Sequence, residues 1–204
     1  MTTFSMSNKV KTTLTLLLLT LVAGSWIQAA DIQFPFYIYK GHHSPDNHFT
    51  PSGWMGDYQD IRFNDHWKPA GSKDPKTVVH ITYAATGKQN NGWAGIYWQT
   101  PANNWGNRPG SLNLNGARKL LFKARGEKGG EAVEEFKVGG ISGDYADSAT
   151  AGIGPVTLAK EWKEYAINLD GQELSSIAGG FCWVMSRDNN PSGSGFFLDD
   201  IRFE

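Results

Sequence analysis

Aromatic rings and primary amides gather in one stretch of the chain, residues 92–106. Flat rings stack on the apolar faces of pyranose rings, and amides both donate hydrogen bonds to hydroxyl groups and accept them. A sugar site needs both kinds of group, and mostly uncharged groups suffice. The stretch therefore predicts a sugar-binding surface built from Trp93, Tyr97, Trp98, Gln99, Asn103, Asn104 and Trp105.

The position of each ring decides whether it can contact a ligand. In a strand, Trp93 and Tyr97 face one way and Trp98 the other, so one of these sets must leave the main core. Which of them binds ligand and which fills the core stays open, because buried aromatics dominate many β cores. Trp105 lies in a loop of Asn, Gly and Pro, and Trp54 in a similar segment. We expect both at an exposed binding surface.

An aspartate, Asp199, interrupts the apolar closing strand of the chain. Alternation puts Asp199 on one face with Phe197 and Ile201, and Asp200 on the opposite face with Arg202. The two aspartates therefore cannot act as one acid–base pair. A carboxylate in an apolar row needs a cation, an arginine or several N–H donors to neutralise it.

Two explanations of Asp199 stay open. Calcium takes several oxygen ligands, which Asp199, an aspartate such as Asp57 or Asp60, and backbone carbonyls of the N-terminal loop would supply. Alternatively, Arg62, Arg202 or loop N–H groups satisfy the carboxylate without a metal.

Histidines near an aspartate offer a second possible metal site. Segment 41–48 contains His42, His43 and His48 beside Asp46, and His66 lies further along the chain. Adjacent histidines point apart in an extended chain, and no regular spacing holds these side chains on one face. We therefore interpret the segment as a polar loop rather than a transition-metal site.

Catalysis has little support in the sequence. Acid–base catalysis needs two carboxylates that converge on a cleft. Asp144, Asp147 and Asp188 lie in predicted loops, and the sequence has no nucleophile elbow, zinc signature or phosphate loop. Binding is therefore favoured over catalysis.

Strands and long loops must position these groups. Segments rich in aromatic and β-branched residues alternate with clusters of Gly, Pro, Asn and Asp, which predicts an all-β, antiparallel β-sandwich of the jelly-roll type. We expect Trp162 and Trp183 in its core, and the single cysteine, Cys182, as a small buried residue. The predicted strands are residues 32–39, 59–64, 77–84, 94–99, 119–125, 134–138, 161–169, 180–186 and 195–203.

The N-terminus has the three-part pattern of a signal peptide over residues 1–30. Lys9 and Lys11 precede an apolar run, and a small-residue exit follows it. This predicts a single domain at 31–204 that is secreted or periplasmic and has no membrane attachment after cleavage. Without the two lysines, 17 basic residues stand against 20 acidic ones, so no nucleic-acid partner is expected.

The closing segment 197–201, Phe-Leu-Asp-Asp-Ile, resembles the end of carbohydrate-binding modules with the galactose-binding-like jelly-roll fold. Further stretches are similar to secreted bacterial domains of this type: 51–57, 93–105, 114–117, 124–131 and 161–165. The resemblance implies this fold, a structural calcium ion at Asp199, and sugar binding as the commonest activity.

Taken together, these observations predict a non-catalytic protein that binds a polysaccharide or oligosaccharide through exposed aromatic rings and holds a structural Ca²⁺. Two alternatives stay open. One is a small polysaccharide lyase or glycoside hydrolase on the same scaffold, and the other is an adhesive surface domain whose tryptophans contact protein.

Overall fold

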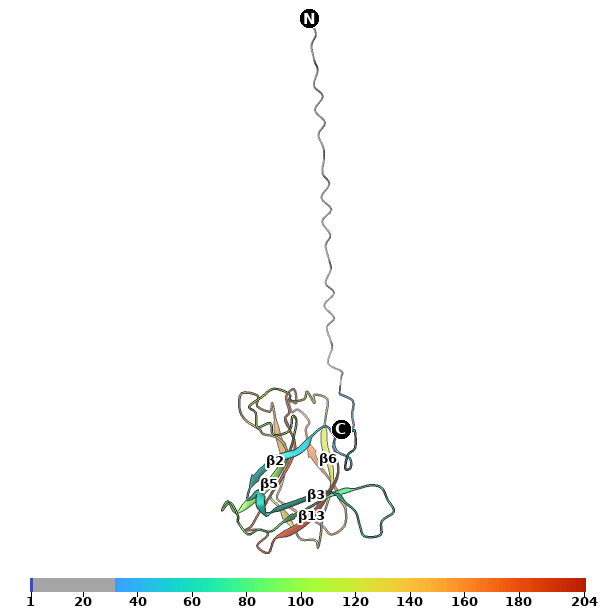
Figure 1. Cartoon of the computed structure of the whole chain (residues 1–204), viewed down its shortest axis with the longest axis vertical. Helices are drawn as coiled ribbons and strands as arrows, with labels where there is room; N and C mark the ends of the chain where they lie inside the picture. Colours follow the sequence, from blue (N-terminus) through green and yellow to red (C-terminus); the bar gives the residue numbers. More distant parts are fainter. Residues whose placement is uncertain (2–31) are drawn as a thin grey trace. The chain divides into compact units, whose positions relative to one another are not determined.

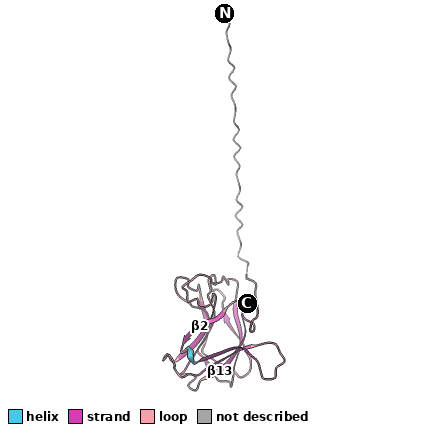
Figure 2. Cartoon of the chain, in the orientation of Figure 1, coloured by secondary structure: helices cyan, strands magenta, loops and turns pink. Residues whose placement is uncertain are grey.

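Strands and their connecting loops make up almost all of the chain that the structure describes (Figure 2). The structure is a computed structural model and describes Met1 and residues 32–204, so the predicted signal peptide lies outside the described residues beyond Met1. A short 3-10 turn, η1 (Tyr58–Asp60), is the helical element of these residues. None of their helical segments is long and apolar enough to cross a membrane.

Two antiparallel sheets form the sandwich, which confirms the predicted fold class (Figure 1). The first sheet has the order β11 (Lys163–Asn168), β6 (Lys119–Gly126), β13 (Ser194–Phe203), β4 (Val78–Tyr83) and β3 (Ile61–Trp67), and β1 (Phe36–Tyr39) also pairs with β13. The second sheet has the order β2 (Thr50–Gly56), β5 (Trp93–Gln99), β12 (Gly179–Ser186), β8 (Glu135–Gly139) and β9 (Thr150–Ile153). A small ribbon joins β7 (Ala132–Val133) and β10 (Val156–Thr157).

Aromatic side chains from both sheets fill the space between them. Phe122 of β6 packs against Phe136 of β8 and Phe181 of β12, with ring centroids 4.6 and 5.1 Å apart. Trp98 of β5 packs against Phe181 at 5.5 Å and is 1% exposed. Trp183 is fully buried, as expected. Trp98 is therefore a core residue, which corrects its assignment to the sugar-binding set.

Cys182 lies on the other face of β12 and is also fully buried. Burial raises the pKa of its thiol, so the thiolate form is suppressed. The cysteine is a small packed residue, as the sequence predicted, rather than a nucleophile.

Two edge strands, β2 and β9, fall outside the predicted strands. Pro51 and Gly53 lie within β2, where the register shifts between them. Proline and glycine are tolerated at a sheet edge, since one side of the strand has no partner to hydrogen-bond. Because proline and glycine are typical of loops, residue composition did not predict β2.

A β-bulge in the closing strand changes the predicted faces. Asp199 pairs with Lys123 and Arg202 with Leu121, so β13 carries one residue more than β6 between these pairs. Asp200 has a φ of 55° at this point. Alternation is broken here, and Ile201 points into the core while Asp199 stays on the outer face of the first sheet. The prediction that Asp199 shares a face with Ile201 was therefore wrong.

Candidate functional site

The most exposed ring of the predicted set is Trp105, in the loop after β5. Its side chain is 41% exposed, and its ring stands edge-on to Tyr97, with centroids 5.9 Å apart and planes at 87°. Tyr97 itself is 4% exposed and donates its hydroxyl hydrogen bond to the carbonyl of Gly139 at 3.0 Å. Burial raises the pKa of Tyr97, so it stays a neutral phenol. Tyr97 is therefore a buried packing partner of Trp105, and Trp105 is the ring that a ligand can reach.

A second loop brings another exposed ring to this place. The backbone N–H of Tyr145 donates to the carbonyl of Gly106 at 2.9 Å, directly after Trp105, and Tyr145 is 45% exposed. The two loops touch so closely that a Cβ on Gly106 would lie 2.2 Å from the carbonyl oxygen of Ser142. Glycine at this position, with a φ of 78°, is what allows the approach.

The carboxylate of Asp147 fixes the second loop. It accepts hydrogen bonds from the backbone N–H groups of Ile141, Ala178 and Gly179. Burial raises the pKa of Asp147 although these donors oppose the shift. Its role is to hold the loop that carries Tyr145, so we remove it from the candidate catalytic acids. Asp144 and Asp188 are exposed residues of separate loops.

Two of the predicted amides hold the first loop together instead of facing solvent. The Gln99 Nε2 donates to the carbonyl of Asn104 at 2.9 Å, and its Oε1 accepts from the Ser52 hydroxyl at 2.9 Å. The Asn104 side chain bonds the carbonyl of Arg108 and the N–H of Gly106. Both amides are fully buried, which corrects the prediction that they bind sugar hydroxyls. Asn103 is exposed, as a sugar contact requires.

Charged side chains of β8 complete the surroundings of Tyr97. The Lys137 Nζ lies 5.4 Å from the centroid of the Tyr97 ring and 3.4 Å from the Glu135 carboxylate. Neither residue is among the predicted sugar contacts, although alternation against the buried Phe136 places both on the outer face of the second sheet. We call Asn103, Trp105, Glu135, Lys137 and Tyr145 the Trp105 surface.

The remaining predicted rings lie elsewhere. Trp54 is 38% exposed, but it pairs with Ile96 on the inward-facing side of the edge strand and its ring contacts Phe63 at 6.1 Å. Trp93 is partly buried on the same face as Tyr97, four residues away along β5, or about 13 Å. Neither ring belongs to the Trp105 surface.

A second group of rings lies on the outer face of the first sheet. Trp162 is 42% exposed, so its prediction as a core residue was wrong. With Trp67, Arg125 and Asp199 it lines a cavity of about 250 Å³. The Arg125 guanidinium lies 5.3 Å from the Trp162 ring, 5.9 Å from Trp67 and 3.8 Å from Phe197. The rings of Trp67, Trp162 and Phe197 therefore already contact the Arg125 cation, whereas no cation contacts the ring of Trp105 among the described residues.

The aspartates predicted to bind calcium are not assembled into one site. Asp57 accepts backbone hydrogen bonds from Gln89, Asn91 and Gly92 at 2.7–3.0 Å. Asp60 accepts from the Thr86 hydroxyl and from the Gly87 N–H. Both carboxylates are buried and serve to hold the loop between β4 and β5, so these hydrogen bonds already occupy their oxygens.

Asp199 lies at the other end of the first sheet. Residue 194 of β13 pairs with Tyr83, which pairs with Ile61 next to Asp60, so Asp199 is five residues or about 17 Å further along. Its Oδ2 lies 2.8 Å from the Lys76 ammonium, and its buried Oδ1 has no hydrogen-bond partner. Neither Arg62 nor Arg202 pairs with it; Arg202 binds Asp200 instead, at 3.0 Å.

The Lys76 ammonium therefore lies beside Asp199, where the sequence predicted calcium, an arginine or loop N–H groups. Burial raises the pKa of Asp199 and the ammonium opposes this shift. Calcium takes several oxygen ligands, and the charged group beside Asp199 Oδ2 is instead the Lys76 ammonium. Calcium binding at Asp199 stays a prediction.

Comparison with known proteins identifies the fold. No protein-family model matches this chain, and no curated protein matches it. A solved structure described as a family 30 carbohydrate-binding module has a TM-score of 0.52 at 14% identity, covering 81% of this chain and 85% of that chain. The fold is that of a carbohydrate-binding module. The family 30 module of a cellulosomal cellulase from Clostridium thermocellum matches with a TM-score of 0.51 at 14% identity, over 82% and 95% of the two chains.

Proposed function

We propose that this protein binds a polysaccharide or oligosaccharide at the Trp105 surface and does not act on it chemically. The observation that carries the proposal is the exposed Trp105 ring, held edge-on by Tyr97 with a second exposed ring, Tyr145, on the adjoining loop. A ring fixed in this way loses little conformational freedom when a sugar stacks on it.

Polar groups around the rings suit sugar hydroxyls. Asn103 offers an exposed amide, and Glu135 and Lys137 offer an acceptor and a donor that are paired with each other. Because the two charges of this pair cancel, the surface favours a neutral glycan over an acidic one. The fold shared with carbohydrate-binding modules, one of them from a cellulase, makes soluble β-glucans the first ligands to test.

The predicted export to the periplasm or the exterior would bring the protein to such polymers. Affinity electrophoresis against a panel of soluble polysaccharides tests the proposal. We expect at least one neutral glycan to retard the protein, and no reducing ends or unsaturated products to appear on long incubation. Unchanged mobility with every glycan contradicts the binding proposal, and accumulation of product contradicts its non-catalytic character.

A further inference from the structure

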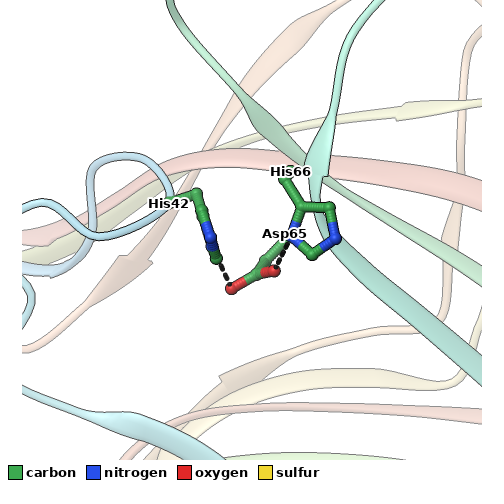
Figure 3. Close-up of side chains that lie close together, drawn as sticks. All are labelled: His42, Asp65 and His66. Carbon is green, nitrogen blue, oxygen red and sulfur yellow. Dashed lines mark ion pairs between the residues drawn. The ribbon is translucent and has the colours of Figure 1, made fainter.

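Three metal-binding side chains converge beside the edge strand β3, away from the Trp105 surface. Figure 3 shows the Asp65 carboxylate between the rings of His42 and His66. The Nδ1 of His42 lies 2.9 Å from one carboxylate oxygen, and the Nδ1 of His66 lies 2.8 Å from the other. The three ligand atoms all lie within 4.8 Å of one another.

A β-bulge explains how neighbouring residues present their side chains together. Asn64 pairs with His80 and Trp67 with Val78, so β3 carries one residue more than β4 between these pairs. Asp65 and His66 occupy this irregular stretch. In a regular strand their side chains would point to opposite faces, and a bulge redirects one of them.

The third residue, His42, lies in a loop that hydrogen bonds hold in place. The N–H of His42 donates to the Thr77 hydroxyl at 2.8 Å, and the Asn47 side chain donates to the carbonyl of Gly41 at 2.8 Å. The carbonyl of Asp65 accepts the hydroxyl of Tyr39 at 2.7 Å. These contacts fix the loop after β1 against β3, so the two halves of the cluster are positioned before any ion binds.

One buried atom of the cluster, the Nδ1 of His42, has no hydrogen-bond partner. The Nδ1 of His42 is buried and makes no hydrogen bond of adequate geometry, although the Asp65 oxygen is near. A buried polar atom without a partner is costly, and an ion on its lone pair would remove that cost.

We propose that His42, Asp65 and His66 bind one divalent transition-metal ion of the zinc type. Two imidazole nitrogens and a carboxylate are ligands that such ions prefer, at about 2.0–2.2 Å each. Ligand atoms around one ion at these lengths are about 3–4 Å apart. The two nitrogen–oxygen distances of 2.9 and 2.8 Å would therefore lengthen by about half an ångström when the ion binds. His66 is largely exposed, which leaves the other coordination positions open to water.

The bound ion would join the loop after β1 to an edge strand of the first sheet. This inference stands apart from carbohydrate binding, because no residue of the cluster belongs to the Trp105 surface. The competing explanation is a carboxylate that bridges two histidines without a metal.

Calorimetric titration with zinc chloride, on protein purified without a polyhistidine tag, separates the two explanations. Residues 1–31 contain no histidine or cysteine to compete for the ion. We expect one ion per chain, and binding at least about tenfold weaker in His42→Ala, His66→Ala and Asp65→Asn. His48→Ala is the matched control, because its exposed ring contacts Phe36 and the Tyr37 carbonyl and should leave the affinity unchanged.

Copper(II) provides a spectroscopic readout of the ligands themselves. The electron paramagnetic resonance spectrum should show coupling to two imidazole nitrogens in the unmodified protein and to one in either histidine variant. Three results would each overturn the proposal: absence of binding, equal affinity in the unmodified protein and Asp65→Asn, or loss of binding only in the His48 variant. Circular dichroism on each variant confirms that the sandwich is intact.

Discussion

Replacement of Trp105 by alanine should weaken glycan binding about tenfold while leaving the fold intact. The side chain is 41% exposed, which for a tryptophan of about 250 Å² leaves roughly 100 Å² available to a ligand. A pyranose that covers half of this area removes about 50 Å² of apolar surface from water. At about 25 cal/mol per Å² this contributes about 1.3 kcal/mol, or close to a factor of ten in Kd.

Isothermal titration calorimetry with the glycan found by electrophoresis measures this loss. Trp54→Ala is the matched control, because Trp54 is 38% exposed but lies on the other face of the second sheet. Its affinity should match that of the unmodified protein. Unchanged affinity in Trp105→Ala, or loss of binding in Trp162→Ala instead, would contradict stacking of the sugar on Trp105.

Three further predictions concern stability. Trp98→Ala should lower the free energy of unfolding by about 3–5 kcal/mol in urea melts, because it opens a cavity against Phe181; a loss under 1 kcal/mol would contradict the core assignment. Burial acts to raise the pKa of Asp57, but its three backbone hydrogen bonds outweigh burial and lower the pKa. The stabilisation by this carboxylate is therefore fully present above the unfolded pKa of about 3.9 and is lost as the pH falls through the lower pKa of the folded state. Asp57→Asn should therefore melt at a lower temperature near neutral pH and show a flatter decline in acid, and an unchanged acid decline would refute this role. Finally, added calcium should leave the melting temperature unchanged because Lys76 neutralises Asp199, and Lys76→Met should lower the melting temperature; a rise with calcium that Asp199→Asn abolishes would instead support the calcium prediction.

Much of the fold could be predicted because strand composition and alternation report burial directly. Leu120, Phe122 and Ala124 of β6 are fully buried, as their alternation indicated. The edge strands escaped notice, because an edge tolerates proline and glycine that a central strand excludes. Alternation also failed at the bulges of β3 and β13, where one extra residue exchanges the two faces of the strand.

The candidate site was predicted in part. A tryptophan in a loop of glycine and asparagine has no core to enter, so Trp105 could be identified from its neighbours alone. The roles of Gln99 and Asn104 could not, since whether an amide faces solvent or its own loop depends on a three-dimensional contact. Tyr145 was missed for the same reason, because it joins Trp105 through a backbone bond between distant loops. The partner of Asp199 likewise comes from a separate loop, which carries Lys76.

The most direct test of sugar binding at the Trp105 surface is a nuclear magnetic resonance titration that follows the indole N–H signals with an oligosaccharide of the retained glycan. We expect the signal of Trp105 to move with the ligand and to saturate, while the signals of the buried Trp98 and Trp183 stay in place. Saturating shifts confined to Trp67 and Trp162 would place the sugar on the opposite sheet and contradict binding at the Trp105 surface.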